Sequence, residues 1–227
     1  MQPPPPFPAP LRGALFDLDG TLADTEPLHH ESAVRVLAAR GRDVRHEDFR
    51  GYIGWAELPF WTELKERYAL PGRPEELVEA RTAAYLELIH DRSIEPLPGI
   101  PELLAELARR GVPCAIASSA PRPQIDASLR ATGLEEHFPL RFSGHDDVTR
   151  GKPAPDVYLA AAAAIGAAPG ECLAVEDSAT GSAAAMASGA YTVLIPGRGV
   201  TGPLPETRHL LLEDAAALAA RLRSSAS

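Results

Sequence analysis

The stretch Ala14-Leu15-Phe16-Asp17-Leu18-Asp19-Gly20-Thr21 joins an apolar run to two carboxylates. Such a run is typical of a buried strand in a parallel sheet. Burying an unpaired carboxylate is costly, so the strand must deliver Asp17 and Asp19 to a place that tolerates charge. In an open α/β sheet that place is the crevice at the carboxyl ends of the strands. We therefore predict that Asp17 and Asp19 begin an active site; the alternative is a strand followed by a plain Asp-Gly turn.

Composition limits the classes of protein to consider. The 227 residues carry a formal net charge of −9, with 45% hydrophobic and 23% charged residues, as in ordinary soluble proteins. The acidic balance argues against a nucleic-acid or anionic-membrane surface, and no stretch is long enough to span a membrane. Cys114 and Cys172 lie in apolar runs and are expected to be free thiols, which favours the cytoplasm. Residues 1–10 are predicted to be a disordered or polyproline lead-in rather than a signal peptide.

The chain divides into a helical insertion and an alternating α/β part. Helical spacing predicts helices at 28–39, 46–52, 57–68 and 75–89 with no strand between them, so residues 24–94 are expected to form a cap domain after the first strand. Residues 11–23 and 95–227 are expected to form the core. The predicted core strands are 112–117, 141–143, 172–175, 191–195 and 209–212, and the predicted core helices are 100–110, 122–131, 153–165, 178–188 and 214–222. Alternating strands and helices indicate a parallel sheet with right-handed crossovers.

Polar residues follow three of the predicted strands, and one lysine precedes a predicted helix. These residues are Asp17 and Asp19, Ser118 and Ser119, Glu176 and Asp177, and Lys152. The carboxyl ends of parallel strands meet at one edge of a sheet, so residues far apart in sequence can share a site there. Clustered carboxylates favour a hard cation such as Mg²⁺, whereas a lysine, a serine hydroxyl and the N–H groups of a helix start suit a phosphate. The combination predicts phosphoryl transfer through an aspartyl-phosphate.

Lysine usage points in the same direction. Only Lys65 and Lys152 are lysines among the 22 basic residues. A lysine is a compact point charge, whereas arginine is a wide fork, so a lysine at the expected phosphate position favours that role. The alternative is a surface lysine in a loop.

Four motifs, in this order, resemble those of the haloacid dehalogenase superfamily, in its phosphatase and β-phosphoglucomutase-like branch with a helical cap. They are Asp17-Leu18-Asp19-Gly20-Thr21; Ser118 at the end of a strand; Gly151-Lys152-Pro153-Ala154-Pro155-Asp156; and Glu176-Asp177-Ser178 followed by Gly181. The resemblance covers Leu11 to about Arg221. It implies an α/β fold with a Rossmann-like three-layer core, a parallel sheet and an inserted all-α cap.

The resemblance also implies a role for each motif residue. Asp17 is the nucleophile, and Asp19 protonates the leaving oxygen and then activates water. Mg²⁺ is bound by Asp17, by the main-chain carbonyl of Asp19 and by Asp177, with Glu176 in or beside that shell. Ser118, Ser119 and Lys152 hold the phosphoryl group. An aspartate that acts as an acid near neutral pH needs a raised or coupled pKa.

Three residues of the expected cap are candidates for substrate contact. His29 matches a position near the site in the mutase branch; the alternative is a solvated histidine. Trp55 is expected either to line the pocket or to pack in the cap core. Arg81 aligns with a basic cap residue that reaches the site in relatives; the alternative is an exposed helix arginine.

The favoured function is a Mg²⁺-dependent phosphatase acting on a small phosphorylated metabolite, such as phosphoglycolate or a sugar phosphate, and working as a monomer or weak dimer. A β-phosphoglucomutase is the first alternative. That branch carries an arginine where this chain has Glu57, and an acid there would repel a second phosphate. A dehalogenase lacks the second aspartate of the first motif, so Asp19 argues against it. An inert binding domain would have lost a catalytic residue, and none is missing.

Overall fold

A six-stranded parallel sheet forms the centre of the molecule. The computed structural model describes residues 4–45, 48–49, 52, 55–197, 206 and 208–225. The strands are β1 (Gly13–Phe16), β2 (Cys114–Ser118), β3 (Leu140–Ser143), β4 (Cys172–Glu176), β5 (Tyr191–Leu194) and β6 (Leu210–Leu211). Their order is β3-β2-β1-β4-β5-β6, and every neighbouring pair is parallel. The chain order reverses at β1, which is the place where α/β sheets bind ligands. The predicted fold class is confirmed.

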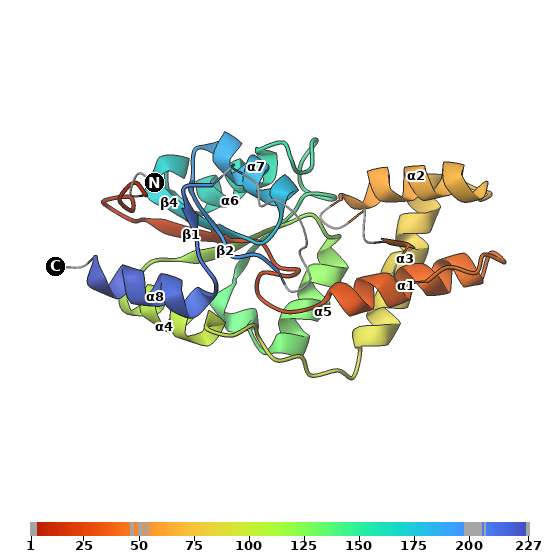
Figure 1. Cartoon of the computed structure of the whole chain (residues 1–227), viewed down its shortest axis with the longest axis horizontal. Helices are drawn as coiled ribbons and strands as arrows, with labels where there is room; N and C mark the ends of the chain where they lie inside the picture. Colours follow the sequence, from red (N-terminus) through yellow and green to blue (C-terminus); the bar gives the residue numbers. More distant parts are fainter. Residues whose placement is uncertain are drawn as a thin grey trace.

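Helices cover both faces of the sheet, which explains why its strands are apolar on both sides (Figure 1). In β1, Ala14 and Phe16 join one core cluster and Leu15 joins the other. The first cluster includes residues of α4 (Ile100–Arg109), α5 (Arg122–Thr132) and α8 (Ala215–Ser224). The second includes residues of α6 (Asp156–Ile165) and α7 (Ala179–Ser188). Short 3₁₀ helices, η2 (Glu135–His137) and η3 (Pro169–Glu171), precede β3 and β4.

Three further helices form a helical module at the end of the molecule away from both termini (Figure 1). They are α1 (Glu26–Ala38), α2 (Glu57–Tyr68) and α3 (Pro74–Ile89). They have their own apolar cluster, in which Trp61 is fully buried. The chain leaves the sheet and returns to it through adjacent segments, because the Leu97 N–H donates to the Leu22 carbonyl at 2.8 Å.

Several element boundaries differ from the predictions. The helix expected at 153–165 begins at Asp156, because Pro153 and Pro155 lie in the turn before it and each disfavours the helical conformation for the residue that precedes it. The strand expected at 209–212 is reduced to Leu210–Leu211. The short helix expected at 46–52 falls largely outside the described residues.

The described part of the lead-in, residues 4–10, contacts the core. The Tyr191 hydroxyl donates to the Pro5 carbonyl at 2.7 Å, and the Phe7 ring packs against Tyr191 with centroids 5.1 Å apart. Phe7 is therefore a partly buried neighbour of the core. Phe7 supplies apolar surface for this contact that the proline count conceals, and the expectation of a disordered or polyproline lead-in stays a prediction.

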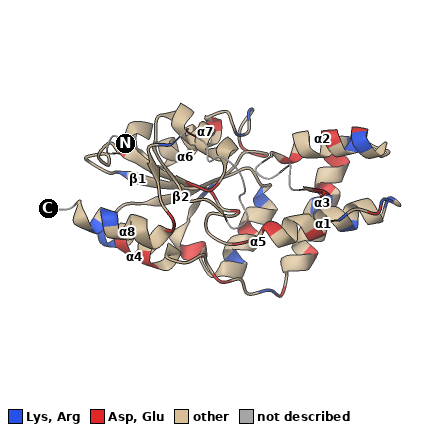
Figure 2. Cartoon of the chain, in the orientation of Figure 1, with Lys and Arg blue, Asp and Glu red and all other residues tan. Residues whose placement is uncertain are grey.

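Charged residues are spread over both parts of the molecule. Figure 2 shows Lys and Arg positions interspersed with Asp and Glu positions along the helices. In the described part of the chain, no helix combines the length and the apolar character that crossing a membrane requires.

Candidate active site

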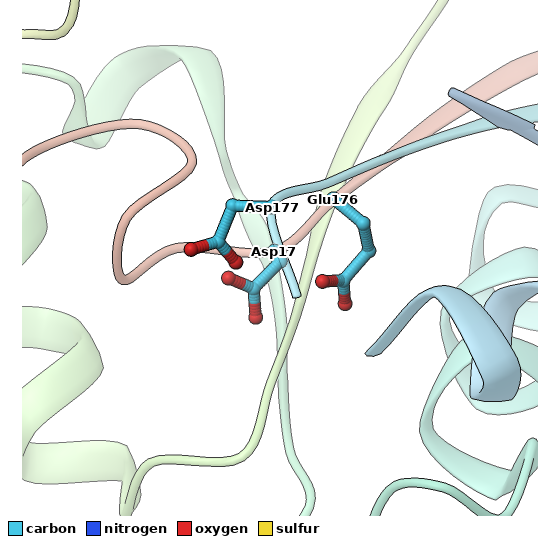
Figure 3. Close-up of side chains that lie close together, drawn as sticks. All are labelled: Asp17, Glu176 and Asp177. Carbon is cyan, nitrogen blue, oxygen red and sulfur yellow. The ribbon is translucent and has the colours of Figure 1, made fainter. Parts of the chain in front are cut away.

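The carboxyl edge of the sheet gathers three carboxylates from two neighbouring strands. Asp17 follows β1, Glu176 ends β4 and Asp177 follows it, and one oxygen of each lies within 4.8 Å of the others. In Figure 3 the carboxylates of Asp17 and Asp177 lie close together, and that of Glu176 stands on the other side of Asp17. The strands β1 and β4 are neighbours, and Phe16 pairs with Val175. The residues that follow this pair, Asp17 after β1 and Glu176 at the end of β4, therefore lie side by side.

Lys152 holds two of these carboxylates. It lies in the loop before α6, and its Nζ donates to Asp17 Oδ1 at 2.7 Å and to Glu176 Oε1 at 2.6 Å. Lys152 is 6% exposed. Burial opposes its charged form, but Asp17 and Glu176 outweigh that effect and raise the pKa of Lys152. Lys152 is therefore a permanent positive charge beside Asp17, and the surface-lysine alternative is excluded.

The carboxylates of Asp17 and Asp177 resist ionisation in the protein alone. Burial, together with the charges of Glu176 and Asp19, raises the pKa of Asp17 to about 7 despite Lys152. Burial and the charges of Asp17 and Glu176 raise the pKa of Asp177 well above its ordinary value. The single positive charge of Lys152 thus does not neutralise three ionised carboxylates, so the cluster suits a further cation.

Glu176 is committed to protein partners. It is fully buried and accepts hydrogen bonds from Lys152, from the Tyr158 hydroxyl and from the Ser178 hydroxyl at 3.2 Å. By contrast, Asp177 forms no side-chain hydrogen bond with the described residues. Asp17 and Asp177 therefore keep oxygens available for a cation, whereas Glu176 positions Lys152. Hard carboxylate oxygens of this kind fit Mg²⁺.

Asp19 sits in a different environment from Asp17. Its Oδ1 accepts hydrogen bonds from the Thr25 hydroxyl at 2.6 Å and from His29 Nε2 at 2.9 Å. Burial works against ionisation, but His29 and Thr25 outweigh it and lower the pKa of Asp19 below its ordinary value. Of the raised or coupled pKa expected at Asp19, the raised pKa is wrong for this arrangement, because His29 from the helical module stabilises the carboxylate.

The two serines at the end of β2 complete the edge. Ser118 is 1% exposed, and its hydroxyl accepts a hydrogen bond from the Ala120 N–H at 3.1 Å. Ser118 and Ser119 line the same cavity as Asp17 and Lys152. The structure therefore brings all seven predicted core residues to the predicted edge of the sheet. Six of them lie at or just after the carboxyl ends of strands, and Lys152 reaches the edge from its loop.

A cavity of about 100 Å³ separates the sheet edge from the helical module. His29, Trp55 and Arg81 all line it. His29 is 8% and Arg81 is 9% exposed, so the alternatives of a solvated histidine and an exposed arginine are excluded. Trp55 is 46% exposed and stands at the rim, with its ring edge-to-face against Tyr52, so packing in the cap core is excluded as well.

Some residues of the site were missed from the sequence. Thr25 lies at the N-cap position of α1, yet its side chain makes no capping bond and donates to Asp19 instead. Tyr158, on α6, bonds Glu176, and nothing in the Ala-rich pattern around it indicates that role. The hydroxyl of Tyr158, the third residue of a helix with five consecutive alanines, is the one signal that could have directed attention to α6.

The parallel sheet, the carboxylates and the lysine at its edge, and the inserted helices define an α/β fold with a candidate active site between the sheet and the helical module. A family model for haloacid dehalogenase-like hydrolases matches residues 11–189. The chain belongs to the haloacid dehalogenase-like hydrolases, and within them it is a phosphoric monoester hydrolase of the phosphatase branch.

Three relatives illustrate the likeness. The chain is 37% identical to protein CbbY of Rhodobacter capsulatus over 199 residues, 82% of this chain and 86% of the relative. It is 32% identical to hexitol phosphatase A of Escherichia coli over 184 residues, 81% and 82% of the two chains. The crystal structure of CbbY from Rhodobacter sphaeroides in complex with xylulose-1,5-bisphosphate superposes with a TM-score of 0.81 at 29% identity, covering 92% of this chain and 96% of that one.

Proposed function

We propose that this chain hydrolyses the phosphate monoester of a small sugar or polyol with Mg²⁺ bound, through a phosphoryl group carried on Asp17. The observation that carries the proposal is that the two aspartates have different hydrogen-bond partners. Asp17 faces Lys152 among the clustered acids, whereas Asp19 is held by His29 and Thr25. Two carboxylates in contrasting environments fit two different roles in one reaction.

Asp17 is the proposed nucleophile. Lys152 on its Oδ1 and the Thr21 hydroxyl, 3.3 Å from its Oδ2, fix the carboxylate. Attack of a carboxylate oxygen on phosphorus forms the aspartyl-phosphate and breaks the bond to the ester oxygen. Mg²⁺, held by Asp17, Asp177 and the main-chain carbonyl of Asp19, would supply positive charge against the phosphoryl oxygens.

Asp19 is the proposed acid and base, with His29 as its partner. The leaving oxygen would take its proton from Asp19, which gains that proton from His29 across their hydrogen bond of 2.9 Å, so a carboxylate with a lowered pKa can still deliver it. In the second half-reaction Asp19 would take a proton from the water that attacks the phosphoryl group. Ser118, Ser119 and Lys152 would hold the phosphoryl oxygens throughout.

The substrate class rests on the cavity and on the relatives. The residues that line the cavity include both aromatic and polar side chains, a lining typical of small-molecule sites. Hexitol phosphatase A and the CbbY that binds a sugar bisphosphate point to phosphorylated carbohydrates. We further propose that residues 24–94 act as a cap whose movement admits substrate, and that the enzyme works in the cytoplasm, where its two free cysteines stay reduced, as a monomer or weak dimer.

Hydrolysis of p-nitrophenyl phosphate tests the proposal. The purified protein should release nitrophenolate with Mg²⁺ and lose that activity with EDTA. Asp17→Asn should reduce turnover by a factor on the order of a thousand or more, because the amide is a poor nucleophile. Asp43→Asn, the same change at an exposed aspartate, is the matched control.

Two results would redirect the assignment. Undiminished turnover in Asp17→Asn would remove Asp17 as the nucleophile. Conversion of β-glucose 1-phosphate to the 6-phosphate without release of phosphate would favour the mutase over the phosphatase.

A further inference from the structure

Glu57 lines the cavity and has one buried carboxylate oxygen without a partner among the described residues. It begins α2 and is 5% exposed, and its Oε1 accepts a hydrogen bond from Arg81 Nη1 at 2.5 Å. Its Oε2 is buried and has no hydrogen-bond partner among the described residues. Glu57 also lines the cavity that contains Asp17. A buried carboxylate oxygen without a hydrogen bond raises the free energy of the folded protein. Glu57 Oε2 therefore indicates a position for a hydrogen-bond donor that the described residues do not supply.

Arg81 is already occupied. Besides Glu57, its Nη2 donates to the His29 carbonyl at 3.2 Å and its Nε to the Ser32 hydroxyl at 3.4 Å. Its guanidinium carbon lies 5.1 Å from the centre of the Phe60 ring. The positive charge of Arg81 is therefore balanced and fixed within the helical module rather than directed at a ligand.

The other basic residues of the module that line the cavity are also paired. His29 contacts Asp19, and His30 Nε2 lies 2.9 Å from Glu26 Oε1. Within the described part of the chain, each basic side chain on the module's side of the cavity thus has a carboxylate partner. Four aromatic rings complete that side: Phe49, Tyr52, Trp55 and Phe60. Among its described residues, this surface combines aromatic rings, paired basic side chains and the unpaired Glu57 oxygen.

We propose, resting on the phosphatase function above, that Glu57 Oε2 accepts a hydrogen bond from a hydroxyl group of the substrate and selects monophosphates over bisphosphates. A hydroxyl is a neutral donor, so it satisfies Oε2 without disturbing the Glu57–Arg81 pair. The aromatic rings pack against the C–H faces of a sugar or polyol. A second phosphate would instead lie beside the negative charge of the Glu57 carboxylate. The basic side chains described on this side of the cavity already have carboxylate partners, so they would not offset that repulsion. The inference therefore separates this chain from the CbbY relative seen with a sugar bisphosphate.

The unmodified enzyme gives the first test. With Mg²⁺, kcat/KM is measured for glucose 6-phosphate, sorbitol 6-phosphate, xylulose-1,5-bisphosphate and p-nitrophenyl phosphate. The better of the two monophosphates should exceed the bisphosphate by about tenfold or more, since a like-charge contact replaces a hydrogen bond. Equal or better turnover of the bisphosphate overturns the inference. Failure to hydrolyse p-nitrophenyl phosphate would instead refute the proposed function itself.

Variants at Glu57 give the second test. Glu57→Gln keeps the side-chain shape and removes the charge, so the preference for monophosphate over bisphosphate should fall by about tenfold. Glu63→Gln makes the same change at an exposed position of α2 and should keep the preference of the unmodified enzyme. Thermal unfolding of each variant checks folding, and the substrate comparison with the unmodified enzyme stands if Glu57→Gln does not fold. An unchanged preference in a folded Glu57→Gln protein overturns the assignment to Glu57.

Discussion

Asp17 and Asp19 are two positions apart, and their surroundings separate them chemically. Asp17 faces Lys152 and two further acids of the core, and Asp19 faces His29 and Thr25 of the segment that enters the helical module. The positions of both aspartates were predictable, because the apolar run before them indicates a strand end. The opposite directions of their pKa shifts were not, because the partners come from elements whose packing no local pattern describes.

The raised pKa of Asp17 predicts how stability depends on pH without metal. Its folded-state pKa is about 7 and its ordinary value is 3.8, so the folded protein binds this proton more tightly than the unfolded chain. Asp17 therefore contributes stability below about pH 4 that is lost as the pH rises toward 7. In EDTA, the unfolding temperature of the unmodified protein should fall over this range relative to Asp17→Asn, in which the group does not titrate. A difference between the two proteins that stays constant from pH 4 to 8 would contradict the assignment.

At the scale of elements, the start of α7 is built around Glu176. A Cβ placed on Gly181 would lie 1.9 Å from Glu176 Oε1, closer than atoms can approach. The glycine lets the first turn of α7 pack directly on the carboxylate that holds Lys152. The fourth motif thus includes Gly181 for a steric reason.

Gly181→Ala should reduce kcat by about tenfold or more, because the methyl group displaces Glu176 and with it Lys152. Helix propensity alone would make Gly181→Ala more stable than the unmodified protein by roughly 0.5–1 kcal/mol, because alanine is favoured over glycine in a helix. A loss of activity would therefore come from the steric clash and not from a weaker helix. Gly170→Ala is the control, since the nearest atom to its added Cβ lies 3.9 Å away. Steady-state kinetics of the two variants decides the matter, and a Gly181→Ala enzyme as active as the unmodified one would contradict this packing.

The strands and helices were largely predictable from the sequence, and the exceptions have physical causes. Apolar runs placed the strands, and the 3.6-residue spacing placed α2 and α3 to within a residue. The start of α6 was set too early because Pro153 and Pro155 were counted into the helix. The roles of His29 and Arg81 stayed open, because spacing shows which residues share a helix face but not what that face packs against.

At the scale of the whole molecule, the helical module is joined to the core along α3 and α5. Tyr85 Oη and Ser128 Oγ share a buried hydrogen bond of 2.7 Å, and Gln124 Nε2 donates to the Thr82 hydroxyl at 3.0 Å. The Tyr85 ring also stacks on His29, with centroids 4.7 Å apart. The contacts between α3 and α5, which we call the seam, therefore link the position of the helical module to His29, the partner of Asp19.

Removing the seam hydrogen bond should destabilise the protein in a way that a second change relieves. Tyr85→Phe leaves the buried Ser128 hydroxyl unpaired, at a cost of about 1–2 kcal/mol, which lowers the unfolding temperature by about 2–6 °C. Adding Ser128→Ala removes the unpaired group and should recover part of that loss. Thermal unfolding of the two single variants and the double variant measures the coupling. Strictly additive losses would show that the two hydroxyls do not interact.

The central claim is that phosphate passes through a covalent bond to Asp17, and the mass of the protein during turnover tests it most directly. In Asp19→Asn the nitrophenolate of p-nitrophenyl phosphate can leave without a proton, but water lacks its base, so the phosphorylated protein should accumulate. Acid-quenched Asp19→Asn should therefore carry one added phosphoryl group at Asp17, and Asp17→Asn should carry none. Continued release of nitrophenolate from Asp19→Asn with the protein unmodified at every time point would contradict the claim.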